Sequence, residues 1–167
     1  MAAGSTYTPI ATATANGSQV TISFTSIPST YTDLVVIAQA SISSGASNIG
    51  MRFNGSGGTA YSETWINGNG TSATSGRGSS QSYTNIDGDS YPTSTTTTVY
   101  NVSIMNYANT STYKTYISRA SNGSRGTASE VCLWQSTAAI NRVDLFVASS
   151  ANFTSGSTFT LYGIQAA

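Results

Sequence analysis

The side chains that could carry out chemistry in this chain are few and far apart. Histidine is absent, so neither a Ser-His-Asp nor a Cys-His catalytic arrangement can form. Glu63 and Glu130 are the only glutamates, and no spacing supports the paired carboxylates of a glycosidase. Cys132, between Val131 and Leu133, has no base beside it, which indicates a sheltered thiol. We therefore expect that the protein is not an enzyme and that it uses no cofactor.

One acidic segment could hold a metal ion. Asp87-Gly88-Asp89-Ser90 offers hard oxygen ligands of the kind that Ca²⁺ prefers. However, no glutamate follows at the spacing of a calcium-binding loop. A solvated Asp-Gly turn is the favoured interpretation of Asp87 and Asp89, and Ca²⁺ binding is the alternative.

Composition excludes two classes of partner. Charged residues make up 7% of the chain, acids and bases balance, and the basic residues are dispersed, whereas nucleic-acid binding requires a clustered basic surface. The longest uninterrupted apolar run, residues 34–38, is far shorter than the roughly 20 residues of a membrane-spanning helix. We expect neither nucleic acid nor membrane as a partner.

The candidate partner-binding residues are apolar or aromatic. Tyr7, Pro9 and Ile10 lie in a segment that can extend across another protein or pair with a sheet edge. Trp65 and Tyr91 flank a hydroxyl-rich stretch, and their rings could stack on sugars. Packing in the core or at its rim is the favoured interpretation of these two rings.

The positions of these residues depend on a chain that alternates apolar and polar side chains almost throughout. Period-two segments separated by Gly, Asn, Ser or Pro predict an all-β protein, because no longer segment has a helical apolar stripe. About ten strands are expected, over residues 18–24, 33–42, 48–53, 61–66, 82–86, 95–107, 113–119, 127–134, 142–148 and 158–164. Their spacing favours an antiparallel β-sandwich of jelly-roll type.

The connections follow from turn residues and composition. Residues 54–58 predict a hairpin between the strands at 48–53 and 61–66, and residues 108–112 predict another between 95–107 and 113–119. The stretch 67–81 is rich in Gly, Ser, Thr and Asn and is expected to be a long loop. Residues 135–140 are expected to form a short helical turn. Residues 1–17 are expected to form a partly extended N-terminal arm, and 18–167 a single sandwich domain.

Five ordered blocks carry a family resemblance. Residues 26–34 (SIPSTYTDL) resemble small structural proteins of tailed bacteriophages, particularly those that infect cyanobacteria. The other matching blocks are 51–55 (MRFNG) with 61–62 (YS), 104–110 (IMNYANT) with 113–115 (YKT), 133–140 (LWQSTAAI) and 159–164 (FTLYGI). The blocks cover most of the chain but contain no catalytic signature. The resemblance implies a virion protein, found either alone or as a module of a tail fibre.

The leading hypothesis is a capsid cement, or decoration, protein that binds the major capsid protein as a homo-oligomer, a dimer or trimer. The chain starts without the basic and apolar regions of a secretory signal, so we expect synthesis in the host bacterial cytoplasm and a final location on the virion surface. The strand pattern begins near residue 18 and leaves no room for a fibre shaft. The alternative is a tail-fibre or receptor-binding module that recognises host glycan. A polysaccharide depolymerase is the third hypothesis, and it requires two carboxylates in one groove.

Overall fold

The computed structural model describes residues 6–165, which form strands and no helix. One sheet has eight strands, in the spatial order β1 (Tyr7–Thr14), β12 (Thr158–Ile164), β3 (Asp33–Ala40), β8 (Thr98–Ile104), β9 (Lys114–Asn122), β10 (Gly126–Trp134), β5 (Tyr61–Gly68) and β6 (Ala73–Gln81). The other has four, in the order β2 (Thr21–Phe24), β11 (Val143–Val147), β4 (Ile49–Phe53) and β7 (Thr84–Asn85). Every neighbouring pair is antiparallel.

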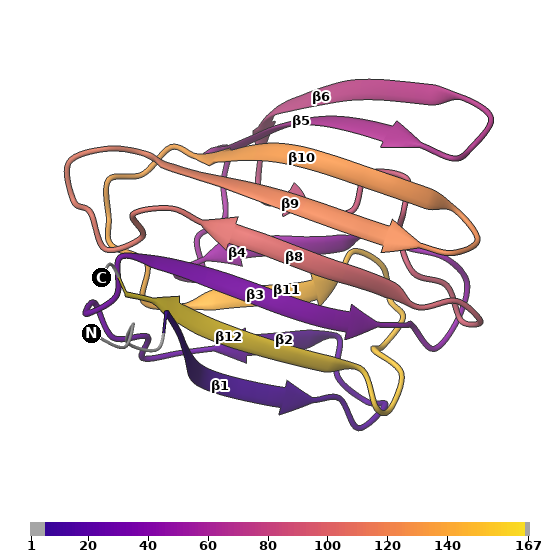
Figure 1. Cartoon of the computed structure of the whole chain (residues 1–167), viewed down its shortest axis with the longest axis horizontal. Coiled ribbons are helices and arrows are strands. Elements are labelled where there is room, and N and C mark those ends of the chain that lie inside the picture. The colour runs from indigo at the N-terminus through magenta and orange to yellow at the C-terminus, as the bar shows by residue number, and fades with distance from the viewer. Residues whose placement is uncertain (1–5, 166–167) are drawn as a thin grey trace.

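The two sheets share one apolar core, with the four-stranded sheet behind the larger one in Figure 1. Val36 and Val102 of the eight-stranded sheet and Leu145 of the four-stranded sheet are fully buried in it. Phe53 of β4 meets Trp134 of β10 with ring centroids 5.5 Å apart. The predicted all-β, sandwich-like architecture is confirmed. Within residues 6–165 there is no helix that could cross a membrane.

Residues 6–165 form twelve strands rather than about ten, and β6 accounts for one of the additions. The predicted loop at 67–81 is wrong, because most of it forms the β5–β6 hairpin. The Asn69 side-chain oxygen accepts hydrogen bonds from the backbone N–H groups of Thr71 and Ser72, at 2.9 and 2.8 Å, and so closes the turn. As an edge strand, β6 needs backbone pairing but no apolar side chains.

The predicted hairpin between 48–53 and 61–66 is also wrong. β4 belongs to the four-stranded sheet and β5 to the eight-stranded one, so the chain crosses between sheets at Asn54. The Asn54 amide donates to the carbonyl of Ala139 (2.8 Å), and its oxygen accepts from the backbone N–H of Asn141 (2.9 Å). These bonds tie the crossover to the segment after β10, where the expected helical turn at 135–140 is absent.

The expected β8–β9 hairpin is confirmed, and β10 extends it to a three-stranded meander. β8 pairs with β9 over residues 98–104 and 116–122, as the hairpin expected between 95–107 and 113–119 requires. β9 then pairs with β10 along its whole length. These three strands form the centre of the eight-stranded sheet and present one continuous surface away from the core.

The segment expected to be an arm is extended, and in residues 7–14 it is the edge strand β1. β1 pairs with β12, with a register shift between Pro9 and Ala11. Residues 1–5 of the expected arm lie outside the described residues. The eight-stranded sheet therefore includes part of the segment that was predicted to lie apart from the domain.

Gly126→Ala should destabilise the protein by about 2 kcal/mol or more. Gly126 has φ of +124°, and a Cβ there would overlap the carbonyl oxygen of Gly68 on β5. In Gly123→Ala, the matched control in the same turn, the new Cβ would meet nothing within 4 Å. Urea unfolding of both variants checks the expectation. Equal stability of the two would show that the close approach at Gly126 is not a constraint.

Candidate functional site

One broad exposed surface is the side of the eight-stranded sheet that faces away from the core. Because successive side chains of a strand point to opposite faces, alternate residues of the five strands β3, β8, β9, β10 and β5 form it. We call this surface the outer face. Its side chains are Asp33, Val35, Ile37, Gln39, Ser62, Thr64, Ile66, Val99, Asn101, Ser103, Thr115, Ile117, Arg119, Ser121, Thr127, Ser129, Val131 and Leu133.

Aliphatic side chains line up across the outer face. Val131 of β10 is paired with Ile117 of β9, and Ile66 lies on the neighbouring strand β5. Ile66 is 62% exposed, Val131 49% and Ile117 39%. Scattered exposed aliphatics are normal, but cross-strand neighbours that share one face form a patch suited to contact with another protein.

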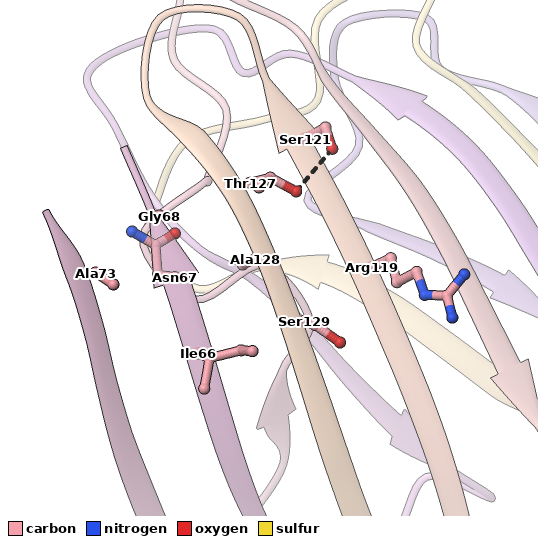
Figure 2. A pocket seen from close by; sticks show the side chains of 9 residues that line it. All are labelled: Ile66, Asn67, Gly68, Ala73, Arg119, Ser121, Thr127, Ala128 and Ser129. Carbon is pink, nitrogen blue, oxygen red and sulfur yellow. Dashed lines mark hydrogen bonds between the residues drawn. The ribbon is translucent and has the colours of Figure 1, made fainter. Parts of the chain in front are cut away.

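The outer face is hollowed where β5, β10 and β9 meet (Figure 2). A depression of about 390 Å³ is lined by residues that include Ile66, Arg119 and Ser129. At one end of it, the hydroxyls of Ser121 and Thr127 are 3.1 Å apart and hydrogen-bonded. An adjoining hollow of about 280 Å³ shares Ile66 and Ser129 and reaches Ile117 and Val131.

Charge is scarce on the outer face. Of its side chains on the five strands only Asp33 and Arg119 are charged, and Arg77 of the edge strand β6, paired with Thr64, faces the same side. Asp33 accepts a 2.6 Å hydrogen bond from the backbone N–H of Asn106. The rest of the surface offers hydroxyl, amide and aliphatic groups. It can provide apolar contact and neutral hydrogen bonds, and it presents no nucleophile with an activating base.

Three carboxyl groups lie instead around the segment 85–88, near the β5 end of the sandwich, with Asp87 and Glu130 buried and Glu63 partly buried. Glu63 accepts a 2.7 Å hydrogen bond from the backbone N–H of Asn85, and Glu130 accepts one from that of Gly88. Asp87 lies between Asn85 and Gly88 in the sequence. It accepts hydrogen bonds from three donors. These are the backbone N–H of Ile49 (2.9 Å), the Asn48 amide (2.8 Å) and the Tyr100 hydroxyl (3.0 Å). The three carboxyls therefore fix the segment 85–88 between the two sheets.

Burial changes the acidity of these groups. Loss of hydration is the main cause that raises the pKa of Asp87 to about 7, against the lowering effect of its hydrogen bonds. Loss of hydration, reinforced by the charges of Asp87 and Glu63, raises the pKa of Glu130 to about 9. Burial also raises the pKa of Glu63. Burial is likewise the first cause that raises the pKa of the Cys132 thiol, which is 1% exposed, as the sequence predicted.

The interior position of the carboxyls bears on two sequence hypotheses. Glu63 and Glu130 do approach each other, which the sequence did not predict, but Glu130 is only 2% exposed. Asp87 is fully buried and fully hydrogen-bonded, so the expected solvated turn is wrong at Asp87, while Asp89 is exposed. Within residues 6–165, no three Asp, Glu or Cys side chains are grouped so that they could hold a metal ion.

Two of the five candidate partner-binding residues, Tyr7 and Pro9, are exposed on the edge strand β1. The Tyr7 ring meets the Tyr162 ring edge to face, with centroids 5.9 Å apart. Ile10, the third candidate on β1, packs against the core. β1 thus divides its candidates between the surface and the interior.

Trp65 and Tyr91 do not form a joint aromatic platform. Trp65 lies on the inner side of β5 against β6, where a Cβ on Gly76 would be 2.5 Å from the indole. The Tyr91 ring is covered on one face by the Arg125 guanidinium, 3.6 Å from the ring centroid. The sequence did not single out Ile66, although its alternation with Trp65 places the two side chains on opposite sides of β5.

No protein-family model, curated protein or solved structure matches this chain. The properties of the outer face and of the buried carboxyls are therefore what bears on function.

The buried carboxyls predict that stability falls as pH rises from 5 to 9. In the unfolded chain these groups ionise near pH 4, whereas in the folded protein their pKa values are raised. Between these pH values the folded state therefore binds more protons than the unfolded state does. As pH rises between its unfolded and folded pKa values, each such group lowers the free energy of unfolding by about 1.4 kcal/mol per pH unit.

Glu130→Gln keeps an acceptor for Gly88 but cannot ionise, so its stability should fall less steeply between pH 7 and 9. The exposed Asp89→Asn is the control and should follow the wild-type curve. Urea unfolding across the pH series checks this. A wild-type curve that is flat from pH 5 to 9 would contradict it.

Proposed function

We propose that this chain is a structural protein of a tailed-bacteriophage virion, and that it acts as a capsid cement, or decoration, protein. In this role it is made in the host cytoplasm, binds the lattice of the major capsid protein as a homo-oligomer, and stabilises the head. The observation that carries the proposal is the outer face, a broad surface with adjoining aliphatic side chains and two charges, Asp33 and Arg119, beside which the edge strand β6 adds Arg77. The resemblance of the five sequence blocks to phage structural proteins supports the same role.

The chemistry of the outer face suits permanent attachment. Protein interfaces place apolar side chains at their centre and polar groups around them. Val131 and Ile117 supply such a centre, and the surrounding Ser, Thr and Asn side chains supply neutral hydrogen-bonding groups. The proposal includes no catalytic step, because the carboxyls of Asp87 and Glu130 are inside the protein.

The strand orders support a jelly-roll assignment. In a jelly roll, the first, eighth, third and sixth strands form one sheet, and the second, seventh, fourth and fifth form the other. Here the sheet β2-β11-β4-β7 corresponds to the first, eighth, third and sixth strands. The strands β3, β8–β10, β5 and β6 correspond to the second, seventh, fourth and fifth, if the β8–β10 meander is counted as one strand. β1 and β12 then extend the sheet beyond β3. Jelly rolls are common in viral capsid and lectin domains, so this fold is compatible with attachment but does not select it.

Several weak contacts can give stable attachment when the protein is oligomeric. Once one subunit is bound, binding of the next is intramolecular, which raises avidity by about 10²–10⁴ without new contacts. A cement protein that joins neighbouring capsid subunits can therefore use a surface whose individual contacts are modest.

Val131→Asp should reduce the occupancy of purified heads at least tenfold, because it places a charge in the middle of the aliphatic patch. Val20→Asp is the matched control, since Val20 is 39% exposed and lies beside the four-stranded sheet. Co-sedimentation of each folded variant with heads measures occupancy. If Val131→Asp bound like the wild type, the outer face would not be the attachment surface.

Attachment should depend weakly on ionic strength. Neutral hydrogen bonds and apolar contacts are screened much less by salt than ion pairs are. Occupancy of heads should therefore change less than about threefold between 50 and 500 mM NaCl, over which charge-mediated binding falls steeply. A steep decrease in this range would indicate that ionic contacts dominate.

The second candidate function is a tail-fibre or receptor-binding module that recognises host glycan. A polar hollow of about 420 Å³ favours it, formed where the β5–β6 turn meets the segment after β7 and the β9–β10 turn. Asn69, Asp89 and Arg125 line it and offer amide, carboxylate and guanidinium groups to sugar hydroxyls. This candidate places the protein on the tail, with the polar hollow as the contact site.

A further inference from the structure

The two edges of the eight-stranded sheet differ in how they are protected. At one edge, β1 contains Pro9, which has no N–H, and its register shifts between Pro9 and Ala11. Proline and irregular pairing are common means of preventing a sheet edge from pairing with another chain. At the other edge, β6 contains no proline and pairs with β5 without interruption from Ala73 to Gly78, with a register shift only between Gly78 and Gln81 (Figure 1).

The β5–β6 turn fixes which backbone groups of β6 point away from the sheet. The backbone N–H of Asn69 donates to the carbonyl of Ser72 at 3.2 Å, so these two residues form a hydrogen-bonded pair. Because hydrogen-bonded and non-hydrogen-bonded pairs alternate along an antiparallel ladder, the backbone groups of Ala73, Ser75 and Arg77 are directed to the free edge. In residues 6–165, no strand pairs with this edge.

We infer that the free edge of β6 pairs antiparallel with β6 of a second copy of this chain. The twofold axis passes between the two Ser75 residues, so Ala73 of each copy is opposite Arg77 of the other. Three hydrogen-bonded pairs then join the copies through backbone groups that the monomer leaves at its edge.

The charges of β6 are compatible with this register. Arg77 is its only charged residue. In the proposed pairing the two Arg77 residues are four positions apart along the strands, a separation of about 13 Å. Repulsion between exposed like charges is largely screened at that distance. Each Arg77 instead lies beside the small side chain of Ala73 from the other copy.

The pairing would add a dimer to the proposed function. The pairing rests on that function only for its biological use. The twofold axis of an antiparallel pair is perpendicular to the sheet, so the two outer faces point to the same side. The hollow that Ile66 and Ala73 line lies beside β6 and would adjoin its counterpart in the second copy. The dimer would present two attachment surfaces side by side, as the avidity argument requires.

Sedimentation equilibrium of the isolated chain tests the pairing. The apparent mass should rise with concentration from 17.2 kDa towards twice that value. Ser75→Pro should keep one chain mass at every concentration, because it removes an edge N–H that the β5–β6 ladder does not use. Ser75→Ala, which keeps the N–H, should dimerise like the wild type. A wild-type protein that stays monomeric at about 1 mM, or a folded Ser75→Pro protein that dimerises normally, would overturn the inference.

Cross-linking provides a second test that does not depend on how the proline variant folds. The only native cysteine, Cys132, is buried, so an introduced thiol on β6 can be followed alone. Opposite Ser75 positions would have Cα atoms about 5.5 Å apart, within disulfide range, whereas the two Ser79 positions would be about 26 Å apart. Under mild oxidation Ser75→Cys should form a covalent dimer and Ser79→Cys should not.

Equal cross-linking of the two cysteine variants would overturn the proposed register. All of these measurements use the isolated chain, and attachment to heads is measured separately. Failure of the β6 pairing is therefore distinguishable from failure of the proposed function.

Discussion

The hydrogen bonds that the carboxyls of Glu63, Asp87 and Glu130 accept around the segment 85–88 are the interaction on which the arrangement of this protein depends. Glu63 and Glu130 extend from the eight-stranded sheet, and Asp87 bonds to the backbone of Ile49 in the four-stranded sheet. The segment is therefore tied to both sheets at the end where the apolar core gives way to polar groups. Neutral carboxyls satisfy this role at a smaller desolvation cost than ionised ones, which accounts for the raised pKa values of Asp87 and Glu130.

The positions of the charges also determine the character of the surface. Three of the six acidic residues, Asp87, Glu130 and Asp144, are buried, and Glu63 is partly buried. Asp144 lies beside Arg52 and Arg142. The outer face consequently has hydroxyl, amide and aliphatic groups with few charges. Such a surface favours contacts that tolerate changes in salt, which is the property that a protein exposed on a particle needs. The inferred β6 pairing would place two such surfaces side by side.

The sequence predicted the features that follow from alternation and missed those that depend on tertiary pairing. Its period-two pattern located the core strands, because burial of one face requires that pattern, and the turn residues at 108–112 located the β8–β9 hairpin. β6 was missed because an edge strand without apolar side chains has no such pattern. The β4–β5 hairpin was wrong because turn residues at Asn54 do not determine which sheet the next strand joins. Convergence of Glu63 and Glu130 was unpredictable for the same reason, since only the fold brings β5 and β10 together.

Localisation of the protein on intact particles tests the central claim most directly. Antibody against the chain, imaged on purified virions by electron microscopy, reports where it is attached. A role as cement predicts label distributed uniformly over the head, with none on the tail. Label confined to the tail would contradict that role and would favour the glycan-binding alternative with the polar hollow at Asn69, Asp89 and Arg125 as its site.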